Sequence, residues 1–97
     1  MRLMTFHEKA SAEVNEAATY YEERVPGLGV LFLVALEEAV QKVLANPEAW
    51  QVVGDETRRN LIRRFPYSLL YVIESDRIRV LAVAHQKRRP GYWRNRL

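Results

Sequence analysis

The stretch from Phe65 to Trp93 constrains the fold most strongly, because it contains two strand-like runs separated by a short polar turn. Residues 67–73 and 77–84 are rich in aromatic and β-branched side chains and follow the period of two that β-strands have. Ser75 and Asp76 lie between the two runs. A two-residue loop joins antiparallel strands, so this stretch predicts a β-hairpin.

The predicted hairpin has two apolar faces. With a two-residue loop, directly opposed residues share a face of the sheet. The core face then pairs Ile73 with Ile78, Tyr71 with Val80, and Leu69 with Ala82, with Tyr67 and Ala84 on the same side. The reverse face places Ser68, Leu70 and Val72 against Val83, Leu81 and Arg79. This reverse face is too apolar to be fully exposed to water.

Two helices are predicted upstream of the hairpin, from apolar residues at helical spacing. The first runs from about Glu8 to Arg24 or Val25, because Pro26 disfavours helix at the residue before it. The second runs from about Leu28 to Ala45 and ends at the Asn-Pro pair that follows. Its first half is apolar nearly all round. We therefore expect it to lie between the first helix and the sheet, or between the sheet and another chain.

The remaining segments predict short strands. Arg2 to Phe6 predicts a strand at an edge or in the centre of the sheet. Residues 48–57 predict a loop with a short strand at residues 50–53 and a turn at Gly54 and Asp55, anchored to the core by Trp50. Residues 58–65 predict another strand, and Pro66 a bend after it. The order β-α-α-β-β-β predicts an α+β fold, in which an N-terminal αα-hairpin covers one face of an antiparallel sheet.

Composition indicates one small globular domain spanning residues 1–97. Hydrophobic residues make up 48% of the chain, yet no apolar run approaches the roughly 20 residues that span a membrane. Met1 to Phe6 is too short for a secretory signal, and the absence of cysteine fits a reducing cytoplasm. With His7 and His85 as the only imidazoles, we expect no metal site, no cofactor and no membrane contact.

Charge is divided sharply along the chain. Residues 1–56 carry 4 basic and 10 acidic side chains, a net charge of −6, whereas residues 57–97 carry 11 basic and 2 acidic ones, a net charge of +9. The two halves could attract each other across the fold. However, ten of the eleven basic residues are arginine, which binds phosphate and carboxylate groups in a bidentate way. This excess favours an anionic partner, either nucleic acid or an acidic protein segment.

A cluster at the C-terminal end combines guanidinium groups with aromatic rings. Its members are Lys87, Arg88, Arg89, Tyr92, Trp93, Arg94 and Arg96. Such a cluster suits nucleic-acid binding, through phosphate contacts and base stacking, and it equally suits docking onto an acidic peptide. The third alternative is a basic tail that is merely solvated. His85 precedes it at a strand end and could act as a general base, although a lone histidine there is more often structural. No phosphate loop, catalytic triad or metal motif accompanies these residues.

Three motifs together make the chain similar to the RelE/ParE superfamily of toxins from bacterial type II toxin-antitoxin, or plasmid-stabilisation, systems. They are the F-P-Y that opens a strand, the L-A-N-P that ends the second helix, and the H-x-x-R-x-P-x-Y-W ending from His85 to Trp93. The resemblance covers nearly the whole chain. It implies a growth-inhibiting toxin in a hetero-oligomer with a cognate antitoxin, whose segment wraps around the helices and sheet. The antitoxin is then a candidate partner for both the apolar reverse face and the basic half of the chain.

The superfamily has two main branches. One branch cleaves messenger RNA on the ribosome, whereas the ParE-like branch acts against DNA gyrase. In the nucleases a basic residue commonly follows the tyrosine that matches Tyr67, and an arginine follows the last strand. Here these positions hold Ser68 and Arg88. Because a lost cation weakens stabilisation of the charge that develops on phosphate, the resemblance favours a ParE-like, non-enzymatic toxin.

A RelE-like, ribosome-dependent mRNA endoribonuclease remains the alternative, with Arg88, His85, Tyr92 and Arg64 as its catalytic candidates. Arg59, Arg63 or Arg64 could then replace the missing cation. A third alternative is an inactive relative that has kept the fold alone. For binding a partner, the predicted residues are Arg59, Arg63, Arg64, Lys87, Arg88, Arg89, Tyr92 and Trp93.

Overall fold

A computed structural model describes residues 3–97 and shows two helices and a five-stranded sheet. The elements are β1 (Leu3–Phe6), α1 (Glu8–Arg24), α2 (Leu28–Ala45), β2 (Gln51–Gly54), β3 (Thr57–Leu61), β4 (Tyr67–Ile73) and β5 (Arg77–His85), with short 3-10 turns at Pro47–Ala49 and Arg94–Arg96. This order confirms the predicted α+β fold. The predicted first strand began at Arg2, which lies outside the described residues.

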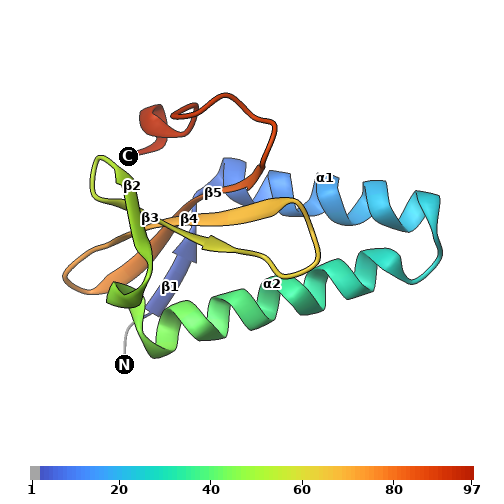
Figure 1. Cartoon of the computed structure of the whole chain (residues 1–97), viewed down its shortest axis with the longest axis horizontal. Coiled ribbons are helices and arrows are strands. Elements are labelled where there is room, and N and C mark those ends of the chain that lie inside the picture. The colour runs from blue at the N-terminus through green and yellow to red at the C-terminus, as the bar shows by residue number, and fades with distance from the viewer. Residues whose placement is uncertain (1–2) are drawn as a thin grey trace.

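Helices α1 and α2 are bounded by residues that favour helix termini. The Nδ1 atom of His7 accepts a hydrogen bond from the backbone N–H of Lys9 at 3.0 Å, which caps the first turn of α1. Gly27 adopts the left-handed conformation with φ of 89° between the two helices, where a side chain would be strained. The short connection makes α1 and α2 an antiparallel hairpin on one side of the sheet (Figure 1).

The sheet is mixed rather than wholly antiparallel. Its strand order is β1-β5-β4-β3-β2, and β1 pairs in parallel with β5, whereas all other neighbours are antiparallel. A parallel pair requires a long crossover, and here the helical hairpin and strands β2–β4 supply it. The strand predicted at residues 58–65 is shorter, because the chain turns after Leu61 before β4 begins. In this strand order the two edge strands are β1 and β2, each of four residues.

A β-bulge in β5 makes half of the predicted register wrong. Close to the turn the pairing is as predicted, with Ile73 opposite Ile78 and Tyr71 opposite Val80. The register then shifts by one residue, so that Leu69 lies opposite Val83 instead of Ala82. A bulge sets two residues against one, and the following side chains change face. Val83 consequently joins the core below the helices, whereas Ala82 and Ala84 lie on the reverse face.

Each face of the sheet carries its own apolar cluster. The cluster below the helices includes Phe32, Leu36 and Val43 of α2 packed on Leu69 and Tyr71 of β4, as the pattern predicted for β4, with Trp50 at its edge. The cluster on the reverse face contains Leu70, Val72, Leu81, Ala82, Ala84 and Trp93. The second cluster is covered by the chain itself, because residues 86–97 cross that face of the sheet (Figure 1).

Substituting Gly29 tests how closely the two helices approach. A Cβ atom at this position would lie 2.6 Å from the carbonyl oxygen of Ala18 in α1. Gly29→Ala is therefore expected to lower the free energy of unfolding by about 1–3 kcal/mol, although alanine ordinarily stabilises a helix. Urea denaturation measures the change. Val30→Ala, at an exposed site on the same helix, is the control and should change little; a stabilised Gly29→Ala protein would contradict the close approach.

Candidate functional site

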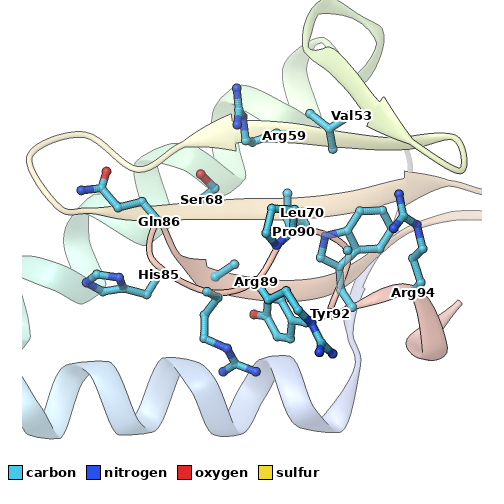
Figure 2. Close-up of a pocket in the computed structure, with 14 residues that line it drawn as sticks. Val53, Arg59, Ser68, Leu70, His85, Gln86, Arg89, Pro90, Tyr92 and Arg94 are labelled. Carbon is cyan, nitrogen blue, oxygen red and sulfur yellow. The ribbon is translucent and has the colours of Figure 1, made fainter.

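A cavity of about 200 Å³ lies between the reverse face of the sheet and the segment formed by residues 86–97. We call it the sheet cavity. Figure 2 shows Arg59 and Ser68 on the sheet side, and Pro90 and Tyr92 on the segment that crosses it. The lining also includes His85, Arg88 and Arg89. The fold thus brings together Arg59, from the third strand, with most of the predicted C-terminal residues.

Trp93 holds the C-terminal segment on the sheet. Its side chain is 4% exposed and packs against Leu70, Val72 and Leu81 in the reverse-face cluster. Burying an indole of this size supplies several kcal/mol of apolar stabilisation. Trp93 is therefore a packing residue that positions its neighbours, and it does not present a free ring for stacking.

Glu13 of α1 is the anchor that sequence reasoning missed. Its carboxylate accepts two hydrogen bonds from the Arg96 guanidinium, at 2.9 Å to Oε1 and 3.1 Å to Oε2, and one from the Tyr92 hydroxyl at 2.7 Å. The side chains of Glu13 and Arg96 are 12% and 8% exposed. A shielded, bidentate carboxylate–guanidinium pair is among the stronger polar contacts in proteins. Glu13 thus joins α1 to the end of the chain.

The same ion pair binds backbone groups of β5 that have no neighbouring strand. The strand β1 ends opposite Val80, so the next residues of β5 have no strand neighbour on that side. Glu13 Oε1 accepts a hydrogen bond from the backbone N–H of Val83 at 3.0 Å, and Arg96 donates one to the carbonyl oxygen of Leu81 at 3.1 Å. Both backbone groups are therefore satisfied without a further strand.

The polar groups of Tyr92 and Arg88 are engaged within the protein. Burial, and next the hydrogen bond to Glu13, raise the pKa of Tyr92 well above its ordinary value. The phenol therefore stays protonated at neutral pH. The Arg88 guanidinium lies over the Tyr92 ring, 3.8 Å from its centroid, and its Nη1 is 3.9 Å from Glu13 Oε2. Arg88 is nevertheless about half exposed.

His85 occupies the end of β5 in a structural environment. Its ring packs edge-on against Tyr67, with the centroids 5.1 Å apart. Its Nδ1 accepts a hydrogen bond from the backbone N–H of Lys87 at 3.0 Å. His85 lines the sheet cavity together with Arg88 and Gln86.

Internal pairing neutralises part of the arginine excess. Arg77 and Arg79 bind Glu74, whose pKa is lowered mainly by the hydrogen bond from Arg77. Arg94 binds Asp55 at 2.7 Å. Glu74 belongs to the same half of the chain as Arg77 and Arg79, whereas the pairs Asp55–Arg94 and Glu13–Arg96 join the two halves. Attraction between the halves thus involves some of the arginines. Within residues 3–97, several predicted binding residues form no ion pair, namely Arg59, Arg63, Arg64, Lys87 and Arg89.

Arg63 and Arg64 lie away from the sheet cavity. They occupy the turn between β3 and β4 and line a separate groove beside α2, with Leu31 and Val34. The predicted residues thus fall on two surfaces, and Arg64 is not brought together with Arg88, His85 and Tyr92. Lys87 lines neither cavity.

Residues 3–97 contain no group of three or more His, Asp or Glu side chains arranged to hold a metal ion. Neither α1 nor α2 has the length and apolar character required to cross a membrane.

Known proteins resemble this chain both in fold and in sequence. A solved structure described as the chromosomal ParDE TA system from P. aeruginosa matches with a TM-score of 0.76 and 19% sequence identity, over 88% of this chain and 96% of that chain. Curated protein sequences give no significant match. A sequence model of the family described as "ParE toxin of type II toxin-antitoxin system, parDE" matches residues 4–90. This range takes in both helices and strands β2–β5, so the chain belongs to the ParE toxin family of type II toxin-antitoxin systems.

Proposed function

We propose that this toxin binds and inhibits DNA gyrase in the cytoplasm and that a cognate antitoxin neutralises it. The observation that carries the proposal is the ParE family match over residues 4–90. The guanidinium groups of Arg59 and Arg89 line the sheet cavity and form no ion pair within residues 3–97, which supports a contact with an acidic partner surface. The protein then acts as a binding module rather than as an enzyme.

The geometry of the nuclease candidates also supports a non-enzymatic toxin. A ribonuclease needs a free base or acid near the attacking 2′-oxygen, together with cations aimed at the phosphate. Here the Tyr92 hydroxyl is bound to Glu13, and one of the two ring nitrogens of His85, Nδ1, accepts a hydrogen bond from the Lys87 backbone. Arg64 lines a different groove.

Cleavage of mRNA on the ribosome remains the second candidate because Arg59, Arg88 and Arg89 line one cavity. Three guanidinium groups in one place could bind a phosphodiester. If the protein is such a nuclease, ribosomes programmed with message yield mRNA fragments when wild-type protein is added. Arg88→Ala then abolishes these fragments.

A supercoiling assay with purified gyrase tests the proposal. We expect the wild-type protein to inhibit supercoiling or to trap the cleavage complex, and the double variant Arg88→Ala/Arg89→Ala to need about tenfold more protein for the same effect. Lys42→Ala, on the exposed surface of α2, is the control and should match wild type. Unchanged supercoiling together with Arg88-dependent message cleavage would replace the gyrase proposal by the nuclease one.

A further inference from the structure

Helix α2 exposes aliphatic side chains on the side that faces away from the sheet. Val30, Leu31, Leu33 and Val34 are 60%, 59%, 44% and 50% exposed. The C-terminal segment crosses the opposite face of the sheet, so it does not shield these side chains (Figure 1). Contiguous exposed aliphatic side chains on a small domain are typical of protein–protein contacts. The charges beside them indicate which partner fits.

The exposed side of α2 changes from apolar to acidic halfway along the helix. The four aliphatic residues all lie between residues 30 and 34, whereas the next exposed residues are Glu37 and Glu38. The Glu37 carboxylate accepts a hydrogen bond from the Gln41 side chain at 3.0 Å. Neither glutamate forms an ion pair within residues 3–97. The apolar stretch is therefore followed by two acids that no basic side chain of the described part neutralises.

Two arginines lie beside the apolar half of the same helix. A groove of about 450 Å³ separates α2 from the turn at residues 63–65, and we call it the α2 groove. Arg63 and Arg64 line it together with Leu28, Leu31 and Val34 of the helix. These two arginines also form no ion pair within residues 3–97. One surface thus carries an apolar centre, an acidic end and a basic flank.

The turn that carries the two arginines is fixed by contacts with the sheet. Ile62 is buried and donates its backbone N–H to the carbonyl oxygen of Tyr67 at 2.9 Å, while Phe65 donates to the carbonyl oxygen of Ile62 at 3.3 Å. Arg64 lies between them with φ of 72°, in the left-handed region that a non-glycine residue seldom occupies. Such backbone strain persists where surrounding contacts enforce it. The basic flank is therefore held in place beside the helix.

We propose that two copies of this chain associate through this surface, with their α2 helices packed antiparallel about a two-fold axis. The aliphatic side chains of one copy then contact those of the other. Antiparallel packing also brings the acidic second half of each helix beside the first half of the other, where Arg63 and Arg64 lie. A parallel pair would instead place acid beside acid and arginine beside arginine. A two-fold interface must be complementary to itself, and this charge distribution meets that condition.

The size of the surface predicts a weak dimer. Helix α2 has 18 residues and is therefore about 27 Å long. A stripe on one helix and a single turn offer less than the roughly 800 Å² per partner that stable complexes bury. We expect the copies to associate in the micromolar range and to separate on dilution. The inference does not depend on the proposed target, because it concerns the protein by itself.

Sedimentation velocity tests the inference on the purified protein at concentrations from about 1 μM to about 500 μM. Wild type should sediment as a monomer at the lowest concentration and as a dimer at the highest. Val34→Glu places a charge in the apolar centre and should stay monomeric throughout. Val52→Glu adds the same charge at an equally exposed site on β2, so it should associate like wild type. Val30→Lys provides a second disrupting variant, and circular dichroism checks that each variant is folded.

Charge exchange tests the antiparallel arrangement. Arg63→Glu/Arg64→Glu should raise the dissociation constant of the dimer at least about tenfold, because acids then face acids. Adding Glu37→Arg/Glu38→Arg to this variant restores both the opposite charges and the net charge of wild type. The fourfold variant should therefore associate within about threefold of wild type.

A wild-type protein that stays monomeric at every concentration would overturn the inference. Dimerisation of Val34→Glu and Val30→Lys at wild-type concentrations would do the same, because the contact would then lie elsewhere. If the fourfold variant associated no better than Arg63→Glu/Arg64→Glu, the antiparallel pairing of glutamates with arginines would be wrong.

Discussion

Replacing Glu13 with alanine is expected to lower the free energy of unfolding by about 3–5 kcal/mol, because the substitution leaves the Arg96 guanidinium buried without its counter-ion. The Tyr92 hydroxyl and the Val83 backbone N–H lose their acceptor in the same step. For a domain of this size such a loss is a large share of the total stability. Urea denaturation followed by circular dichroism measures it.

Glu16→Ala provides the matched control, since Glu16 lies on the same helix and is exposed. Its effect should stay within about 0.5 kcal/mol of zero. In Glu13→Ala, trypsin should also cleave faster after Lys87 and Arg88, because the C-terminal segment loses its contact with α1. A loss below about 1 kcal/mol for Glu13→Ala, with unchanged proteolysis, would show that the ion pair contributes little beyond what its burial costs.

Trp93→Ala is the second substitution with a large expected effect, a loss of about 3–5 kcal/mol in the free energy of unfolding. The indole is 4% exposed and packs on Leu70, Val72 and Leu81. Its removal exposes the reverse face of the sheet, so the variant should bind more of a hydrophobic dye than wild type does. Urea denaturation and dye fluorescence provide the two measurements.

Trp93→Phe and Tyr20→Ala are the comparison variants for this measurement. Phenylalanine restores part of the apolar contact and should cost clearly less than alanine. Tyr20 is an aromatic residue with 48% exposure, and its substitution should have a small effect. If Trp93→Ala were as stable as Tyr20→Ala, the C-terminal segment would not be packed on the sheet in solution.

Much of the fold follows from local sequence signals. The bounds of α1 and α2 agree with those that Pro26 and the Asn46-Pro47 pair predict, because proline acts on its immediate neighbours. The β4–β5 turn likewise depends on two adjacent residues. These signals act over a few positions, so a single sequence is enough to find them.

The bulge in β5 has no such local signal. Residues 80–84 read Val-Leu-Ala-Val-Ala, which is apolar at every position. Alternation specifies register only where one face is polar, so the pattern could not locate the extra residue after Val80. The bulge was therefore invisible in the sequence although it decides which face Val83 occupies.

Long-range pairing was equally hidden. In the sequence, Glu13 resembles the other glutamates that lie on the solvent-exposed side of the first helix. Its partner Arg96 lies 83 positions away. The parallel pairing of β1 with β5 also joins distant segments. In the candidate site, sequence reasoning grouped the C-terminal arginines and aromatics, whereas the division between the sheet cavity and the α2 groove depends on the three-dimensional path of the chain.

The pairing of β1 with β5 has a consequence for synthesis. Leu3 pairs with Arg77, so the first strand stays without a strand neighbour until β5 has been translated. Sheets built on such distant contacts form slowly, because the intervening polypeptide must first be brought together. A nascent chain consequently cannot pair β1 with β5, or complete the surface that this sheet supports, before β5 has left the ribosome.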